Sequence, residues 1–327
     1  ELWVRDTLSP AAVLTLGESP LLLSARTAVA ELWSTERAES AGDGEEEELV
    51  TTPVEETPLD AADAADNGIP ARTLVPTAPS GYTVCGRAYI SNTTDHTLDV
   101  TALTDTFDAE LADDGPQILI LHTHGSEAYT PDGTDIYEPS DNNTRTLDEN
   151  YNMVRVGDEM ERVFTELGLS VVHDTTLYDY PRYSGAYDRS AEAVKNYLEQ
   201  YPTIKIVLDV HRDALVGEDG TVYKAVTRID GVDTAQVMLV LGSSEGGEHP
   251  GWMENLALAC RLQESMNNLY PTLARPMTMR SSRYNQQLST GSVLVEVGTH
   301  GNTLQEALSA ARLFARSAGQ VLLELEG

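Results

Sequence analysis

The chain has 327 residues, which is enough for one or two domains and a full-sized hydrophobic core. Hydrophobic residues make up 41% of it and charged residues 23%, as is typical of a soluble globular protein. The formal net charge of −32 argues against a nucleic-acid-binding role, because the sequence offers no basic surface to neutralise phosphates. The sequence contains no run of roughly 18 apolar residues and so predicts no membrane span.

Residues 1–80 are predicted to form an acidic, largely disordered stalk. Residues 38–80 are rich in Glu, Asp, Ala, Thr and Pro, nearly lack aromatic residues, and include a run of four glutamates at 45–48. Such a composition cannot bury enough apolar surface to offset the entropy that is lost on ordering. We therefore expect that removal of residues 1–75 leaves folding and activity largely unchanged.

Residues 81–115 are predicted to form a small β-containing segment that leads into the main domain, because short alternating runs occur at 82–84 and 88–90. The two cysteines, Cys85 and Cys260, lie near a predicted strand and within a helical pattern. They could pair as a disulfide or remain buried free thiols, and two cysteines do not identify the redox compartment.

Residues 116–327 are predicted to fold as the main domain, of the α/β class. Strand patterns alternate with helical patterns in which apolar residues recur at three- and four-residue spacing. The strands are expected at 118–121, 169–172, 204–210, 221–226, 235–241 and 292–295, and the helices at 150–167, 187–200, 252–268 and 303–325. This rhythm predicts a mixed, mostly parallel sheet flanked by helices.

Three of the predicted strands end on residues that can bind a metal or transfer a proton. The first runs into His124, with Glu127 three residues later; the second runs into His211; and the third runs into Glu296. Active sites of open α/β sheets gather beyond the carboxyl ends of the strands, so we expect these side chains to converge. Two histidines and a carboxylate are the ligand set of a hydrolytic zinc site, and a further glutamate can act as general base.

Each of these residues also has a plainer structural interpretation. His124 and Glu127 could be a surface histidine and a capping glutamate, and His122, on the same side of the strand, could be the ligand instead of His124. Glu296 could face solvent. If it is buried among its apolar neighbours, desolvation raises its pKa toward the range of a general base.

Arg212 directly follows His211 in the sequence. An arginine at this strand end could hold a substrate carboxylate bidentately, or it could pair with Asp213 at the sheet edge. Charge placed this close to a buried strand is costly unless it is paired or functional. We therefore include Arg212 among the candidate site residues.

Several sequence blocks, in consistent order over about residues 82–325, resemble those of the stage II sporulation protein P family. The blocks are His122-Thr123-His124 with Glu127 and Tyr129, Tyr151-Asn152 leading to Val156-Gly157, residues 209–214, Tyr284-Asn285-Gln286 with Leu288-Ser289, and Glu296-Val297-Gly298 with Asn302-Thr303. Residues 1–80 resemble nothing in these blocks, which fits a variable stalk.

The resemblance implies the fold of zinc amidases and zinc carboxypeptidases, with Zn²⁺ as cofactor. By similarity to the carboxypeptidase branch, the metal ligands are His124, Glu127 and His211, and Glu296 is the base. By similarity to the amidase branch, the middle carboxylate comes instead from the start of the following helix. In this sequence Asp148 and Glu149 lie at that position. In this reading, glycan or stem-peptide groups are held by Arg212 and the loop of Tyr284, Asn285 and Gln286.

The resemblance also implies a function and a location. It suggests a zinc-dependent N-acetylmuramoyl-L-alanine amidase, with endopeptidase activity on stem-peptide cross-links, that acts in forespore engulfment. Stage II sporulation proteins D and M are the implied partners, and the implied location is the extracytoplasmic face of the membrane. Because the sequence begins at Glu1, we expect that an anchor has been removed from it. The alternatives are a zinc carboxypeptidase or endopeptidase that acts only on peptides, and a non-catalytic wall-binding scaffold.

Overall fold

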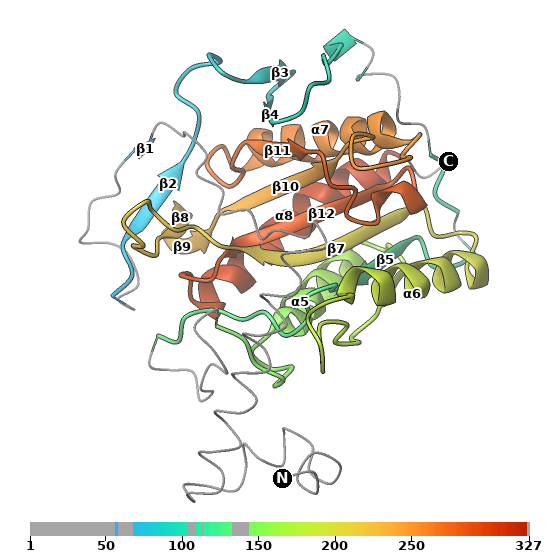
Figure 1. The fold of residues 1–327 in the computed structure, drawn as a ribbon, viewed down its shortest axis with the longest axis horizontal. Helices are drawn as coiled ribbons and strands as arrows, with labels where there is room; N and C mark the ends of the chain where they lie inside the picture. Colours follow the sequence, from blue (N-terminus) through green and yellow to red (C-terminus); the bar gives the residue numbers. More distant parts are fainter. Residues whose placement is uncertain are drawn as a thin grey trace, which may run out of the picture.

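The computed structural model describes residues 56–57, 68–101, 103, 107, 109–112, 114–132 and 144–325. The predictions for residues 1–55 and 58–67, which make up most of the expected stalk, lie outside the described residues. At the centre is an eight-stranded sheet (Figure 1). Its strands, in spatial order, are β3 (Thr83–Cys85), β4 (Ala88–Asn92), β11 (Met277–Arg280), β10 (Val237–Gly242), β12 (Ser292–Thr299), β7 (Ile206–Asp213), β5 (Ile118–Leu121) and β6 (Val171–His173).

The sheet is mixed and mostly parallel, which confirms the predicted fold class. Only β3–β4 and β10–β12 pair antiparallel, while the other five neighbouring pairs are parallel. The segment 81–115 was expected to be a small β-containing segment that leads into the main domain. Its strands β3 and β4 form one edge of the central sheet, because β4 pairs in parallel with β11.

Four helices cover the two faces of the sheet (Figure 1). Helices α5 (Met153–Glu166), α7 (Trp252–Leu269) and α8 (Leu304–Leu323) pack on one face, and α6 (Ala186–Gln200) packs on the other. Side-chain caps fix two of the helix starts. The side chain of Asn152 accepts from the Val154 N–H at α5, and Thr303 and Glu306 form a reciprocal capping box at α8. None of the described helices is long and apolar enough to cross a membrane.

The alternation of side chains along β12 separates the core from the site. Val293, Val295 and Val297 belong to the large core beneath α7 and α8. Leu294 and Glu296 therefore point to the opposite face, since successive residues of a strand face opposite sides. That second face carries α6 and the candidate site.

Cys85 and Cys260 are both buried and free. The sequence left open a disulfide or two buried free thiols, and the structure has the free thiols. The thiols lie on β3 and α7, where they join the apolar core.

A second, smaller sheet lies beside the first and moves the expected stalk boundary. It consists of β1 (Glu56–Thr57), β2 (Ala71–Leu74), β8 (Lys224–Ile229) and β9 (Val232–Ala235). Strand β2 pairs in parallel with β8, Leu74 is buried, and its N–H donates to Gln236 Oε1 at 2.7 Å. Residue 80 is therefore too late a boundary. The composition of this stretch concealed a short strand that is stabilised by distant partners.

A pair of truncations measures the contribution of β2. Removal of residues 71–75 would expose the β8 edge and take the Leu74 N–H away from Gln236 Oε1, while Gln236 Nε2 would keep its bond to the Thr272 carbonyl. We therefore expect a loss of stability, contrary to the prediction that removal of residues 1–75 leaves folding largely unchanged. Relative to a chain that begins at residue 68, a chain that begins at residue 76 should lose about 3 kcal/mol of stability. This loss corresponds to a fall of roughly 6–12 °C in Tm, measurable by calorimetry. Equal melting of the two chains would show that β2 contributes nothing.

Candidate active site

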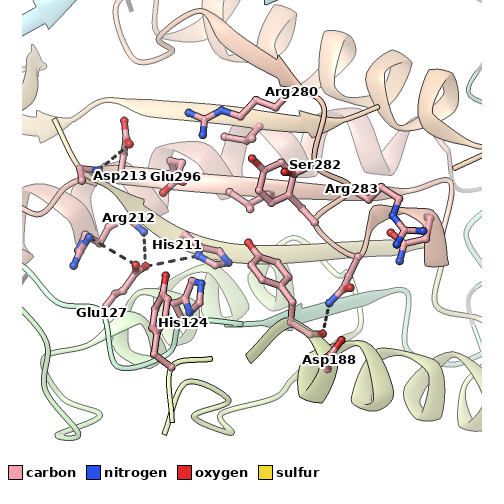
Figure 2. A pocket seen from close by; sticks show the side chains of 18 residues that line it. His124, Glu127, Asp188, His211, Arg212, Asp213, Arg280, Ser282, Arg283 and Glu296 are labelled. Atoms are coloured by element: carbon pink, nitrogen blue, oxygen red, sulfur yellow. Dashed lines mark hydrogen bonds and ion pairs between the residues drawn. The ribbon is translucent and has the colours of Figure 1, made fainter. Parts of the chain in front are cut away.

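The predicted strand ends meet at one cavity of about 300 Å³ on the α6 side of the sheet (Figure 2). Of the eight residues predicted from the sequence, seven line it: His124, Glu127, His211, Arg212, Tyr284, Asn285 and Glu296. Val240 and Leu294 supply apolar lining, while Tyr183, Tyr187 and Arg280 add polar groups. Side chains from β7, β12 and the chain after β5 thus converge as the strand-end rule predicts.

His211 and Glu296 lie at the same height on neighbouring strands. In the parallel pairing of β7 with β12, His211 is the register partner of Glu296. Asp209, two residues before His211, shares its face of the strand. The sheet itself therefore fixes the relative placement of an imidazole and two carboxylates.

Asp209 orients the imidazole of His211. Asp209 Oδ1 lies 2.8 Å from His211 Nε2, and its carboxylate also accepts from the N–H and Oγ1 of Thr123 at 2.8 and 2.6 Å. Burial disfavours a charged His211, but the Asp209 carboxylate outweighs burial and raises the pKa of His211 to about 9. With Nε2 turned to Asp209, Nδ1 faces Glu127 Oε2 at 3.7 Å. A carboxylate behind a ligating histidine is a common way of fixing the tautomer at metal sites.

His124 presents an imidazole without a hydrogen-bond partner at Nδ1 within the described structure. Its ring stacks on Tyr183 at a centroid distance of 4.5 Å and stands perpendicular to His211 at 5.3 Å. Burial, followed by the nearby charge of His211, lowers the pKa of His124 well below its ordinary value. A neutral, buried imidazole nitrogen without a donor is chemically suited to bind a metal ion.

Glu127 is buried and is held from two sides. Its Oε1 lies 3.9 Å from Arg145 Nη2 and 3.7 Å from Arg212 Nη1. Its Oε2 accepts from the Arg212 backbone N–H at 3.3 Å and faces His211. Arg145 and Arg212 thus both approach Oε1, while Oε2 is turned toward His211. Figure 2 shows the contacts of Glu127 with Arg212 and His211.

The alternative ligands suggested by the sequence lie elsewhere. His122 does not line the cavity; its Nδ1 is 2.9 Å from the carbonyl oxygen of Val210. Asp148 and Glu149 are exposed, and Asp148 accepts from the side chain of Asn150. The described geometry therefore favours His124 over His122, and Glu127 over Asp148 and Glu149.

The ligand atoms of His124, Glu127 and His211 are not drawn together into a tight triad. In the described part of the chain, the group of three such atoms within 4.8 Å of one another is formed by Asp158, Glu161 and His173. The donor set of the cavity nevertheless suits zinc, since it combines two imidazoles with one carboxylate. His124 Nδ1 has no hydrogen-bond partner among the described residues, and all three side chains line the cavity. Both observations fit a zinc site.

Glu296 has the properties of a general base. It is half-buried, and its Oε2 has no hydrogen-bond partner among the described residues. Burial, followed by the negative charge of Asp213, raises the pKa of Glu296 to about 8. Asp213 is itself held by Arg275 Nη1 at 2.7 Å. The direction of the shift is the one expected from the apolar sequence around Glu296.

Arg212 lines the cavity, but the contacts described for its guanidinium lead toward the His124–Glu127 segment. Its Nε donates to the carbonyl of Ala128 at 3.1 Å, and Nη1 approaches Glu127. Asp213, the other partner that the sequence suggested for Arg212, lies 2.7 Å from Arg275 Nη1. These contacts suit a residue that positions Glu127.

The loop 284–286 divides into two parts with different roles. Tyr284 and Asn285 line the cavity with φ of 50° and 57°, an uncommon conformation for non-glycine residues. Asn285 Nδ2 donates to the Tyr187 carbonyl at 2.7 Å and so ties the loop to α6. Gln286 is buried and does not line the cavity, because its amide bonds to Gly242 N–H and Val240 O, both at 2.8 Å. Its predicted role in binding substrate is therefore replaced by a structural one.

Replacing Gln286 tests this assignment. Gln286→Ala leaves two buried backbone groups of β10 unpaired, so the free energy of unfolding should fall by about 2–4 kcal/mol in denaturant titrations. Gln287→Ala is the matched control, because Gln287 lines the cavity and its Oε1 has no partner within the described structure. The control should lose less than about 1 kcal/mol. Equal losses would contradict the structural role.

Several residues of the site escaped the sequence analysis. Four of them line the cavity: Tyr183, Tyr187, Asp188 and Arg280. The fifth, Arg145, does not line it but contacts Glu127 and Tyr183, which do. Arg280 ends strand β11, so the strand-end rule would have found it had 277–280 been recognised as a strand. The two tyrosines and Asp188 come from the turn and the first residues of α6, where no local pattern distinguishes them from ordinary surface residues. Arg145 lies 4.4 Å above the ring of Tyr183 and reaches Glu127 only through the tertiary fold.

The fold and the cavity define an α/β protein with a buried histidine–carboxylate site at the carboxyl ends of its strands. Residues 26–318 match the family model of stage II sporulation protein P. The chain belongs to this family.

Among characterised relatives, the chain is 26% identical over 209 residues to stage II sporulation protein P of Bacillus subtilis (strain 168). The aligned region covers 61% of this chain and 49% of the relative, so the chain spans about half the length of that protein.

Solved structures with some likeness include three amidases, two of which are described as N-acetylmuramoyl-L-alanine amidases. The AmiC2 amidase of Nostoc punctiforme is 15% identical with a TM-score of 0.37, covering 64% of this chain and 97% of that one. Apo Ami1 of Mycobacterium abscessus is 15% identical with a TM-score of 0.39, and the match covers 64% of this chain and 99% of that one. The CwlD amidase of Clostridioides difficile, in complex with the GerS lipoprotein, is 14% identical with a TM-score of 0.39, and the match covers 64% of this chain and 98% of that one.

Proposed function

We propose that this chain is a zinc-dependent peptidoglycan hydrolase that cleaves the amide bond between N-acetylmuramic acid and L-alanine. The proposal rests on one observation, the convergence of His124, Glu127, His211 and Glu296 on a single cavity. Membership of the stage II sporulation protein P family supports it, because the sequence blocks that resemble that family include these four residues.

The chain's own groups can divide the work of an amide hydrolysis. His124, Glu127 and His211 would hold the zinc ion, with Asp209 fixing the His211 ring. Zinc, when bound, would polarise the scissile carbonyl and lower the pKa of a water molecule. Glu296 would accept the proton of the attacking water and pass it to the leaving amine nitrogen, since its raised pKa suits both transfers.

The wall of the cavity opposite the ligands fits a substrate with carboxylates and glycan hydroxyls. Arg280 is half-buried there and is hydrogen-bonded to Tyr284, while Asn285 and Asp188 offer further polar groups. Stem peptides carry free carboxylates, which an arginine can bind with two hydrogen bonds. In this proposal Arg280 takes the substrate-binding role that the sequence analysis gave to Arg212.

We further propose that the protein acts on the cell wall during forespore engulfment, at the extracytoplasmic face of the membrane and held there by an anchor. Stage II sporulation proteins D and M are the proposed partners. The support is family membership. Affinity capture of this chain from sporulating cells, followed by detection of stage II sporulation proteins D and M, tests the proposed partners separately from the proposed reaction.

Digestion of purified sacculi tests the reaction. Amidase activity releases free stem peptides and leaves glycan strands without peptide. A peptidase that acts only on peptides instead leaves shortened peptides attached to glycan, and a scaffold releases neither. The zinc-loaded chain should give the first pattern, and the chelated chain should be inactive. Shortened, glycan-linked peptides as the only product would overturn the assigned bond.

A further inference from the structure

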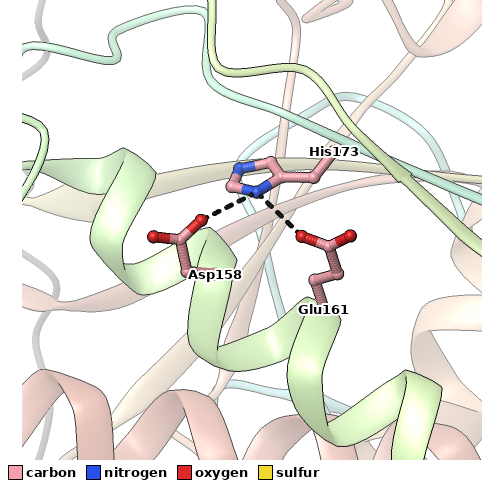
Figure 3. Close-up of side chains that lie close together, drawn as sticks. All are labelled: Asp158, Glu161 and His173. Carbon is pink, nitrogen blue, oxygen red and sulfur yellow. Dashed lines mark ion pairs between the residues drawn. The ribbon is translucent and has the colours of Figure 1, made fainter.

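A cluster of side chains of the kinds that can bind a metal ion lies between β6 and α5 (Figure 3). Helix α5 packs on the face of the sheet opposite to α6 and the cavity. His173 Nδ1 lies 3.3 Å from Asp158 Oδ1 and 3.5 Å from Glu161 Oε2. Asp158 and Glu161 are three residues apart on α5, so both point to the same side of the helix. None of the three lines the cavity.

Hydrogen bonding fixes the tautomer of the histidine that supports this cluster. His122 Nδ1 lies 2.9 Å from the carbonyl oxygen of Val210, which can only accept, so Nδ1 carries the hydrogen. The ring is fully buried, and no ion pair with a carboxylate is recorded for it in the described part of the chain. It is therefore neutral, and its Nε2 is an acceptor.

The tautomer of His173 follows from that of His122. The two Nε2 atoms lie 2.9 Å apart, and since His122 Nε2 accepts, His173 Nε2 must donate. The remaining nitrogen of a neutral His173, Nδ1, then carries a lone pair. This lone pair faces the oxygens of Asp158 and Glu161, which are acceptors too.

Three acceptors pointing at one another are unstable unless a metal cation lies between them or His173 carries a second proton at Nδ1. The His173 side chain is only 2% exposed, and its Nδ1 has no hydrogen-bond donor among the described residues. Water therefore cannot readily satisfy the nitrogen, and the arrangement costs free energy as it stands. A divalent ion placed between the three atoms would turn the mutual repulsion into attraction.

We propose that His173, Asp158 and Glu161 form a second metal site, which takes a zinc-class divalent transition ion. Ligand atoms about 2.1 Å from a tetrahedral zinc ion lie roughly 3.4 Å apart, and the two observed separations are 3.3 and 3.5 Å. An imidazole ligand with only two carboxylates selects this class over Mg²⁺ or Ca²⁺, which prefer six or more oxygens. His173 is buried but Asp158 and Glu161 are about half exposed, so water can reach the carboxylate side of a bound ion and supply the fourth ligand there.

Gly157 shows that this region is built for close approach. A Cβ atom at position 157 would lie 2.4 Å from His173 Nε2 and 2.6 Å from His122 Nε2. Only glycine lets α5 come close enough to place its two carboxylates beside the imidazole. A bound ion would thus fasten α5 to the edge strand β6, apart from any catalytic role.

Metal counting on four chains tests the site independently of the proposed function. The chains are the parent, His211→Ala, the pair Asp158→Asn with Glu161→Gln, and the combination of all three substitutions. Each is stripped with chelator, reloaded with Zn²⁺, dialysed, and analysed for zinc by elemental analysis. We expect about two ions per parent chain, one in His211→Ala, one in the Asp158→Asn/Glu161→Gln pair, and none in the combination.

A matched control removes the same charge from another helix. Glu192→Gln with Glu199→Gln neutralises two exposed carboxylates of α6 and should keep the parental zinc content. Zn²⁺ should also raise the Tm of His211→Ala, and this shift should vanish when Asp158→Asn and Glu161→Gln are added. These two substitutions keep side-chain size at exposed positions, so the chain should still fold.

The outcomes separate the second site from the cavity site. If the parent holds one ion and His211→Ala holds none, the second site is overturned. That result is the one expected if His173 carries a second proton instead of binding a metal ion. One ion in the parent that survives in His211→Ala and is lost in the Asp158→Asn/Glu161→Gln pair would support the second site and contradict the proposed zinc site in the cavity.

Discussion

His211→Ala should abolish hydrolysis and remove the metal ion from the cavity. The substitution deletes one of two imidazole ligands and leaves the Asp209 carboxylate without its partner at 2.8 Å. A carboxylate and a single imidazole bind zinc far more weakly than three protein ligands do. Release of stem peptides from sacculi should fall below detection. To count the cavity ion alone, His211→Ala is added to a chain that already carries Asp158→Asn and Glu161→Gln. The zinc content should then fall from about one ion per chain to none.

The control for this experiment is a histidine outside the cavity. His96 stacks on Trp252 and hydrogen-bonds Ser244, so His96→Ala removes an imidazole without touching the site. It should keep both activity and the cavity ion. If His211→Ala still holds about one zinc ion in the chain that also carries Asp158→Asn and Glu161→Gln, then His211 is not a ligand and the metal assignment in the cavity is wrong.

The sequence predicted the layout of the central sheet where the elements are long and regular. The runs that became β5, β7 and β12 are fully or almost fully buried, so their apolar composition identified them. Strand β11 is four residues long and is stabilised by two parallel neighbours, which no local pattern reveals. Strand β2 was missed for the same reason, since its partner β8 lies some 150 residues away in the sequence.

The strand-end rule placed the candidate site but not the direction of each side chain. It brought His124, His211 and Glu296 to one cavity, because the carboxyl ends of neighbouring strands lie together. It could not separate His124 from His122, since that difference depends on how the chain turns after β5. For Gln286, too, sequence gives no means of telling an amide that binds the backbone from one that binds a ligand.

Glu296→Gln should separate the base from the metal ligands. The amide keeps the size of the side chain but cannot take a proton from water, and general bases contribute on the order of 10²–10⁴-fold. We therefore expect turnover to fall at least about a hundredfold while the zinc content stays at the parental value. Activity of the parent should rise with pH as Glu296 loses its proton, and a bound cation should bring this rise below pH 8, because positive charge lowers a carboxyl pKa.

Stability of the metal-free chain gives a second measurement on the same variant. The carboxyl of Glu296 has a pKa of about 8 in the folded chain against an ordinary value of 4.5, so the folded state holds the proton more tightly. Its contribution to stability is complete below pH 4.5 and is lost as the pH rises toward 8. At pH 8 and above, metal-free Glu296→Gln should therefore melt at a higher temperature than the parent. If Glu296→Gln loses zinc on dialysis, Glu296 is a ligand and Glu127 becomes the candidate base. If Glu296→Gln keeps zinc and near-normal turnover, the mechanism is refuted.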